Sequence, residues 1–444
     1  MRIVIAGAGE VGSHLAKLLS NEEQDIMLVD DNAERLAMLD ANYNLMTVVG
    51  NPTSFSTLRE AGAGSCDLFI AVTPYESNNL VACSIAKNLG ATTTVARIDT
   101  YEFMDPANTA HVRHMGVDRV IYPEYLAAQE IISALKRTWV RNWFELHDGR
   151  IILAGVKLRQ SAPIVGMKIK DFAFTNRNFH VSAIKRNHET IIPRGDDHIE
   201  AGDILYFTTT RDHIDELISL TGKTEQRIKR VLIMGGSKIA IRLVNLGHEE
   251  FRFKIIESDF ERCRKLPQKC PDCEIIHGDA RDIDLLGDIG ISDMDAFVAL
   301  TDSSETNIFT CLTAKELGVK KTVADVETIQ FISQAENLNI GTVVNKKLLA
   351  SSSIFQLLLD ADASTAKCLA LADAEVAELE ARPGSKITRM PVKDLSLPRD
   401  LTLAGLIRGN DGMLITGNTV IEPGDHVLVF CLAGALHKVE RLFN

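Results

Sequence analysis

The chain repeats itself, and this repeat constrains its fold more than any other feature. The stretch RIVIAGAGEVG at residues 2–12 returns as RVLIMGGSKIA at residues 230–240, an offset of 228 residues. The same offset aligns Asp67–Thr73 with Asp295–Thr301. A repeat this long indicates two copies of one unit, so whatever the first copy folds into must appear twice.

The first copy opens with a pattern typical of a dinucleotide-binding fold. Ile3–Ala6 form a short apolar run that predicts a buried parallel strand, and Gly7, Gly9 and Gly12 follow in the spacing G-x-G-x-x-G. In that spacing the first glycine makes a tight turn, the second lets the backbone approach a pyrophosphate, and the third lets helix and strand pack closely. The N-terminus of the following helix offers free N–H groups and a partial positive charge to phosphates.

A second apolar strand ends in an acidic residue. Ile26–Val29 lead into Asp30, close to the ~20 residues after the glycines at which a carboxylate takes the ribose hydroxyls. That carboxylate would repel a 2′-phosphate, so the sequence favours NAD(H) over NADP(H).

Strands and helices then alternate, with further apolar strands expected at 45–49, 68–72, 94–98 and 120–122. Ligands bind beyond the carboxyl ends of such strands. We expect Gly50 and Asn51 to lie along the adenosine and Thr73 to close over the dinucleotide. Arg97 fits either a phosphate or a salt bridge to a neighbouring chain. Pro123 opens a helix to about residue 139, which we expect to join two such domains.

The sequence pattern changes after residue 141. Short apolar strands and turns predict a small α+β module, and its turn Glu200–Asp203 returns as Glu422–Asp425. The expected fold class is therefore α/β: two Rossmann-like doubly wound parallel-sheet domains, each followed by a small α+β C-lobe. The predicted boundaries are 1–141 for the first N-lobe, 142–225 for the first C-lobe, 226–365 for the second N-lobe and 366–444 for the second C-lobe.

The second copy departs from the pattern at its glycines. They become Gly235, Ser237 and Ala240, and serine adds a side chain where the backbone should meet a pyrophosphate. Glu257 keeps a ribose-directed carboxylate, whereas Asp325 replaces Arg97 and would repel a phosphate. Whether the second site binds nucleotide stays open.

The bulk properties exclude some functions. The net charge of −12 and the pI of about 5.5 argue against nucleic acid as a partner, which needs a basic stripe. No apolar run approaches the ~18 residues of a membrane span, and Met1-Arg2 leads straight into a strand, so we expect a cytosolic protein.

The eight cysteines are scattered along the chain, and we expect them to be reduced. Cys263, Cys270, Cys273 and His277 have the residue types of a zinc site but no second C-x-x-C, and we interpret them as residues of a helix-to-strand connector rather than as metal ligands.

No acid, base or nucleophile converges beside a substrate pocket, so we expect no catalytic residues and a sensor rather than an enzyme. Three alternatives remain: an NAD-dependent oxidoreductase with a duplicated fold, a methyltransferase, and a structural ring protein with vestigial sites. The glycine spacing followed by Asp30 favours a dinucleotide over S-adenosylmethionine.

Over essentially its whole length the chain resembles the TrkA-type regulatory subunits of bacterial potassium uptake systems, which carry two tandem RCK units. The resemblance is carried by the glycine stretch, Asp30, the turn at residues 50–53, residues 69–73 and 95–97, the Pro123 helix, the C-lobe turn and their repetition. It implies binding of NAD(H), and also ATP or ADP. It further implies a homotetramer whose ring of eight N-lobes lies at the inner face of the membrane, beneath a Trk-type potassium transporter subunit.

The residues expected to bind nucleotide follow from both arguments. In the first copy they are Gly7, Ala8, Gly9, Glu10, Val11, Gly12, Asp30, Asn51, Thr53, Thr73, Pro74 and Arg97. In the second copy they are Gly235, Gly236, Ser237, Lys238, Ile239, Glu257, Asp279 and Thr301.

Overall fold

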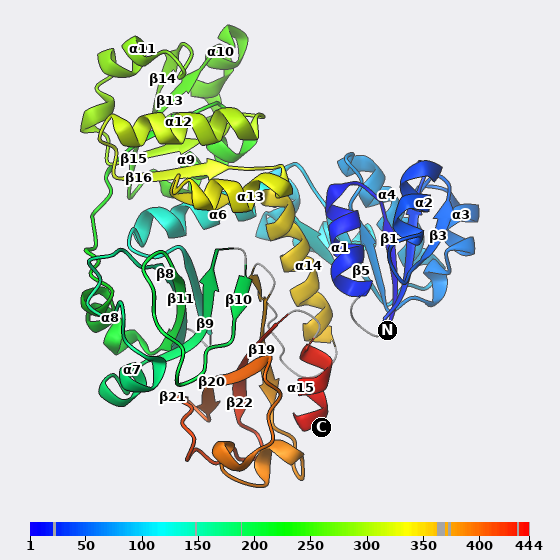
Figure 1. Cartoon of the computed structure of the whole chain (residues 1–444). Coiled ribbons are helices and arrows are strands. Elements are labelled where there is room, and N and C mark those ends of the chain that lie inside the picture. Colours follow the sequence, from blue (N-terminus) through cyan, green and yellow to red (C-terminus); the bar gives the residue numbers. More distant parts are fainter. Residues whose placement is uncertain are drawn as a thin grey trace. The chain divides into compact units, whose positions relative to one another are not determined.

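A computed structural model of the chain describes all residues except 21–23, 147–148, 188, 362–368, 372–373, 433–434 and 444 (Figure 1). The predicted boundary between residues 365 and 366 lies outside the described residues. The chain divides into two compact units. One comprises Met1–Ala127 with Asn345–Ala361, and the other comprises Ala128–Val344 with Asp362–Asn444.

The first unit is built on a parallel sheet with the strand order β3-β2-β1-β4-β5-β6, the order of a dinucleotide-binding fold. Its strands are β1 (Arg2–Ala6), β2 (Asp25–Asp30), β3 (Met46–Val49), β4 (Leu68–Ala71), β5 (Thr93–Arg97) and β6 (Arg119–Ile121). Its helices include α1 (Glu10–Ser20), α2 (Ala33–Asp40), α3 (Phe55–Glu60), α4 (Glu76–Leu89) and α5 (Thr109–His114). Ile3–Ala6 are fully buried, as expected for a central parallel strand covered on both faces.

The second unit contains a matching sheet, in the order β14-β13-β12-β15-β16-β17. Its strands are β12 (Arg230–Met234), β13 (Arg252–Glu257), β14 (Cys273–His277), β15 (Ala296–Ala299), β16 (Lys321–Asp325) and β17 (Thr342–Val344). Its helices are α9 (Lys238–Gly247), α10 (Phe260–Lys269), α11 (Ile283–Asp288), α12 (Ser304–Glu316) and α13 (Ile329–Asn337). The register repeats too, because Ile3 pairs with Leu68 as Val231 pairs with Ala296. The predicted duplication and fold class are confirmed.

Two small antiparallel sheets also belong to the second unit. The first is β10-β9-β11-β8-β7, from β7 (Asn142–Leu146), β8 (Ile151–Lys157), β9 (His180–Arg186), β10 (Glu189–Ile191) and β11 (Ile204–Thr209), with α7 (Ile169–Thr175) and α8 (Ile214–Leu220). The other is β18-β19-β22-β20-β21, from β18 (Leu369–Leu371), β19 (Ala374–Glu380), β20 (Leu401–Arg408), β21 (Asp411–Leu414) and β22 (His426–Leu432), with α15 (Leu436–Phe443).

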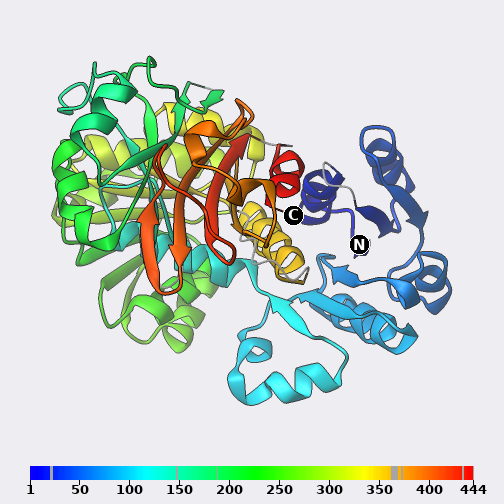
Figure 2. The ribbon, with the colours of Figure 1, turned by 90° about the horizontal axis from the view of Figure 1, so that it is seen from below.

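These two sheets share one apolar core. Tyr206 of β11 and Phe430 of β22 have ring centroids 5.8 Å apart within a cluster of buried residues from both modules. Figure 2 shows the orange sheet lying over the green one. His180 Nε2 lies 3.1 Å from Thr402 Oγ1 across this contact, and burial lowers the pKa of His180 to about 4.

The repeated turn of the two modules has a structural cause. The carboxylate of Asp203, 1% exposed, accepts hydrogen bonds from Arg186 Nε at 2.9 Å and Nη2 at 2.8 Å, and from the Glu200 N–H at 2.9 Å. In the second module Asp425 accepts the same bonds from Arg408 and the Glu422 N–H. The acid of each turn is therefore a buried anchor for an arginine on the neighbouring strand.

Two long helices connect the parallel sheets to the rest of the chain. α6 (Pro123–Lys136) starts at the predicted proline and ends three residues before the predicted end at 139. Its second half lies in the second unit, where Lys136 pairs with Glu250 at 2.5 Å. α14 (Lys346–Ala361) lies beside α1 in the first unit (Figure 1), and Ser351 Oγ donates to the Val11 carbonyl at 3.4 Å.

The cysteine cluster divides between elements. The predicted connector holds for residues 270–272, whereas Cys263 lies within α10 and Cys273 and His277 lie in β14. Burial raises the pKa of Cys270 to about 11 and that of Cys273 to about 12, so both thiols stay protonated near neutral pH. Within the described residues, no three histidine, cysteine or acidic side chains gather as a metal site would require.

Candidate nucleotide site

The loop between β1 and α1, here called the glycine turn (residues 7–12), takes the conformation that its glycines require. Gly7 has φ +110°, where a side chain would be strained, and a Cβ there would lie 2.8 Å from the Thr73 nitrogen. A Cβ on Gly12 would lie 1.8 Å from the Gly7 carbonyl oxygen. A Cβ on Gly9 would have no neighbour within 4 Å, so the backbone at Gly9 faces open space. The first and third glycines are therefore needed for folding, whereas the second leaves room for a ligand.

The Asp30 carboxylate accepts a hydrogen bond from the backbone of the glycine turn. One carboxylate oxygen accepts the Ala8 N–H at 2.6 Å, and the other accepts the Asn32 N–H at 2.9 Å. Arg35 lies 3.8 Å from the same group. Each carboxylate oxygen has two acceptor positions, so ribose hydroxyls can still bind to this acid. Sequence reasoning assigned Asp30 to the ribose only and did not foresee that it fixes the glycine turn.

The other predicted residues of the first copy lie around the same sheet edge. Asn51 Oδ1 accepts from the Thr53 N–H at 2.9 Å and from the Thr53 hydroxyl at 2.8 Å, so these two residues fix the turn after β3. Pro74 is exposed after β4. Val11 is buried on α1, and the Glu10 carboxylate is paired with Lys347 of α14. Val11 and Glu10 can thus offer a ligand their backbone N–H groups rather than their side chains.

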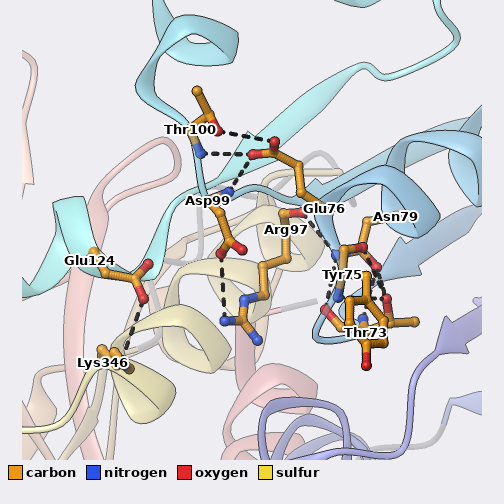
Figure 3. A network of polar contacts seen from close by, with 9 residues as sticks. All are labelled: Thr73, Tyr75, Glu76, Asn79, Arg97, Asp99, Thr100, Glu124 and Lys346. Atoms are coloured by element: carbon orange, nitrogen blue, oxygen red, sulfur yellow. Dashed lines mark hydrogen bonds and ion pairs between the residues drawn. The ribbon is translucent and has the colours of Figure 1, made fainter. Parts of the chain in front are cut away.

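Polar side chains at the ends of β4 and β5 form a strand-end network (Figure 3). Asn79, 1% exposed, accepts from the Thr73 N–H at 2.8 Å and the Thr73 hydroxyl at 2.7 Å. Its amide donates to the Thr73 carbonyl at 3.0 Å and to the Arg97 carbonyl at 2.9 Å. One side chain thus holds two strand ends together beside the glycine turn.

Arg97 lies in this network with spare donor capacity. Its Nη2 is 3.8 Å from Asp99 Oδ1, a loose ion pair, and its buried Nε has no hydrogen-bond partner among the described residues. Of its two predicted roles, the observed pairing is with an acid of its own chain. An unsatisfied buried donor costs about 1–3 kcal/mol, so an anion that reached it would bind favourably.

The network extends to α14. Glu76 accepts the N–H groups of Asp99 at 2.5 Å and Thr100 at 2.7 Å, which shapes the loop after β5. Glu124 at the start of α6 lies 3.6 Å from Lys346 Nζ at the start of α14 (Figure 3). The edge that carries the candidate site is therefore tied to both long helices.

In the second copy, six of the eight predicted residues line a cavity of about 170 Å³. Its lining includes Gly235, Gly236, Ser237, Glu257, Asp279 and Thr301. Lys238 and Ile239 follow as the first residues of α9, the former exposed and the latter buried. Glu257 repeats the role of Asp30, since it accepts the Gly236 N–H at 2.7 Å.

Two features of the cavity were missed by sequence reasoning. Asn307 makes the same four bonds to Thr301 and Asp325 that Asn79 makes in the first copy. Arg262 lines the cavity and is the counterpart of Arg35. Both residues recur in the repeat, which was the available signal. Asp279 is held by a bidentate pair with Arg281 that keeps the pKa of this carboxyl below its usual value.

Ser237 changes the phosphate end of this second cavity. It is the N-cap of α9, and its hydroxyl accepts the Ala240 N–H at 3.4 Å, whereas the equivalent Gly9 has no side chain. The Ala240 N–H, which could otherwise donate to a phosphate, is thus occupied by the Ser237 hydroxyl. We expect Ser237→Gly to strengthen binding of a nucleotide diphosphate at the second cavity by about tenfold, at a cost of only a few tenths of a kcal/mol in stability. Titration calorimetry with ADP on both proteins checks this, and unchanged affinity would contradict it.

These features define a protein with two tandem Rossmann-type domains, each of which carries a candidate nucleotide site at the carboxyl ends of its strands. Comparison with known proteins agrees. The model of the TrkA-N domain matches residues 3–123 and 231–346, and that of the TrkA-C domain matches residues 153–222 and 376–444. The Trk system potassium uptake proteins TrkA of Halomonas elongata and Haemophilus influenzae are each 31% identical to this chain, over 100% of it and 99% of their own length. The solved GsuK channel bound to NAD has a TM-score of 0.60 at 16% identity, and the match covers 100% of this chain and 78% of that one.

The chain belongs to the TrkA family of Trk potassium uptake proteins. Within its described residues, no helix is both long enough and apolar enough to span a membrane.

Proposed function

We propose that the chain is a nucleotide-sensing regulatory subunit of a Trk-type potassium uptake system, that it binds NAD(H), and also ATP or ADP, and that it performs no catalysis. Two observations carry the proposal: Gly9 of the glycine turn faces open space, and the buried Arg97 Nε at the end of β5 has no hydrogen-bond partner among the described residues. The family membership supplies the transporter context, and the NAD-bound GsuK channel has the same fold.

In this proposal each predicted residue has a task. The N–H groups of the glycine turn hold the diphosphate, Asp30 takes the ribose, Asn51 and Thr53 line the adenosine, and Thr73 with Pro74 closes the site, while Arg97 adds positive charge. The equivalent residues of the second copy are Gly235, Gly236, Ser237, Lys238, Ile239, Glu257, Asp279 and Thr301. The four modules are divided at residues 141/142, 225/226 and 365/366.

Bound nucleotide acts by shifting conformations rather than by reacting. A ligand shifts an equilibrium only by its difference in affinity for the two states, commonly about 1–3 kcal/mol. We place the protein on the cytoplasmic side of the membrane as a homotetramer with eight N-lobes in a ring, in contact with the transporter subunit. Nucleotide occupancy would then bias the transporter through that contact.

The test is Gly9→Asp, because the added carboxylate occupies the space meant for the pyrophosphate and repels it. Gly287 of α11 offers a matched control, since a Cβ there also has no neighbour within 4 Å. We expect Gly9→Asp to weaken NADH binding by more than about tenfold and to abolish the response of potassium uptake to nucleotide, and Gly287→Asp to change neither. Unchanged binding and unchanged uptake in Gly9→Asp would overturn the proposal, and turnover of NADH with a candidate substrate would favour the oxidoreductase.

A further inference from the structure

The second unit contains a cavity of about 320 Å³ that neither nucleotide site uses. Cations from several elements line it, and we call them the basic pocket: Arg141, Lys157, Arg159, Lys223, Lys315, Lys320 and Lys321. Lys321 begins β16, so the basic pocket lies at the amino ends of the second parallel sheet. The nucleotide sites lie at the carboxyl ends. This is therefore a separate site.

The positive charges of the basic pocket are poorly neutralised. Among the described residues, none of the seven forms an ion pair with a carboxylate. Arg141 and Lys315 instead donate to backbone carbonyls, of Gly341 and Asn339 respectively. The carboxylate that acts on Arg141 and Lys157 belongs to Glu336, which is already paired with Lys185 at 2.8 Å.

The duplication shows that this charge is not needed to build the sheet edge. At the offset of 228, Lys87 is the counterpart of Lys315, and it pairs with Asp118 at 2.7 Å. The counterpart of Lys321 is the uncharged Thr93, because Leu68 pairs with Thr93 as Ala296 pairs with Lys321. In the first copy, the counterpart of Lys315 is neutralised by Asp118 and the counterpart of Lys321 carries no charge. In the second copy, both lysines line the cavity.

Burial and the repulsion between neighbouring positive charges lower the pKa values of two lysines in the basic pocket. Lys321, 7% exposed, has its pKa lowered to about 7 by burial and by Arg141 and Lys315, with Glu130 opposing. Lys223 has its pKa lowered to about 8 by burial and by Arg159, Arg141 and Lys157. An anion in the cavity would relieve this repulsion and return both lysines to the charged form.

We propose that the basic pocket binds a small molecule carrying a di- or triphosphate chain. Arginine forks and lysine point charges are the side chains that recognise phosphate oxygens, and a cavity of this size falls in the range of small-molecule sites, about 300–1,000 Å³. The cations gather in a cavity rather than along a stripe, and the chain as a whole carries a charge of −12, so nucleic acid does not fit. Hydroxyls of Thr138, Thr322 and Thr342 in the lining can also donate to phosphate.

The experiment is titration calorimetry of the full chain with inorganic tripolyphosphate and, separately, with ATP. The variant is Lys157→Met with Lys223→Met, which removes two half-buried charges and keeps the apolar stems. Arg159→Ala, at an exposed position, removes a charge without altering buried packing. Lys170→Met is the matched control, because Lys170 belongs to the same C-lobe but pairs with Asp196 on the surface.

We expect tripolyphosphate binding to weaken more than tenfold in the double variant and severalfold in Arg159→Ala, with Lys170→Met unchanged and NADH binding unchanged in all three. At pH 8, binding should take up protons, seen as a dependence of the enthalpy on the buffer. ATP is also proposed to bind the N-lobe sites, so only the part of ATP binding that the variants remove reports on the basic pocket. If the variants weaken both tripolyphosphate and ATP binding, the natural ligand is a nucleotide, whereas weaker tripolyphosphate binding with unchanged ATP binding indicates an inorganic chain. Equal tripolyphosphate affinity in wild type, the double variant and Arg159→Ala would overturn the proposal, including where the proposed NADH binding still holds.

Discussion

Gly12→Ala is expected to lower the free energy of unfolding of the first parallel-sheet unit by about 3 kcal/mol and to abolish NADH binding there. The new Cβ would lie 1.8 Å from the Gly7 carbonyl oxygen, so either the turn or α1 must move. Neither can move cheaply, because α1 packs against both the sheet and α14. Chemical denaturation and titration with NADH measure the two effects.

Gly9→Ala is the matched control, and the two glycines separate folding from binding. A methyl group at Gly9 meets no atom within 4 Å, so the unfolding free energy should change by less than about 1 kcal/mol. NADH binding should still weaken by about tenfold, because the methyl group stands where the diphosphate must approach the backbone. Equal loss of stability in the two variants would contradict this division of roles.

Asn79→Ala is expected to destabilise the same unit by about 3 kcal/mol. The substitution removes four hydrogen bonds and leaves the Thr73 N–H and the Arg97 carbonyl buried without partners, each at a cost of about 1–3 kcal/mol. Asn88→Ala on the same helix is the control, because Asn88 is exposed and its side chain, among the described residues, bonds only to the Ser84 carbonyl of its own helix.

The binding consequence of Asn79→Ala is as informative as the loss of stability. Asn79 fixes the ends of β4 and β5, so NADH affinity should fall even at temperatures where the variant is folded. A denaturation midpoint like that of Asn88→Ala, or wild-type NADH affinity, would show that the strand ends do not depend on this side chain.

Much of the fold could be predicted from the sequence because its signals are local. The apolar run of residues 3–6 and the glycine spacing define a strand, a turn and a helix within a dozen residues. The offset of 228 then predicts the second sheet, whose register the structure confirms.

The parts that escaped prediction depend on contacts between distant residues. Asp30 holds the Ala8 N–H across 22 positions, and Asn79 reaches the Arg97 carbonyl across 18, distances at which periodicity carries no signal. The basic pocket draws cations from positions between 141 and 321, and in the sequence each is an ordinary charged residue. The place of α14 beside α1 could not be foreseen either, because its sequence follows the second sheet.

Because α14 packs against α1, the first parallel-sheet unit contains a helix from the second half of the chain, and the two repeats are not separate structural units. A chain truncated after the first C-lobe would lack the helix that covers α1, leaving Val11 and its apolar neighbours in water. Only Asn345 separates β17 from α14, so a ligand that displaces the start of α1 acts on a helix that is joined directly to the other Rossmann sheet. The first unit is thus completed by a helix from the second half of the chain, and that helix is continuous in sequence with the last strand of the second parallel sheet.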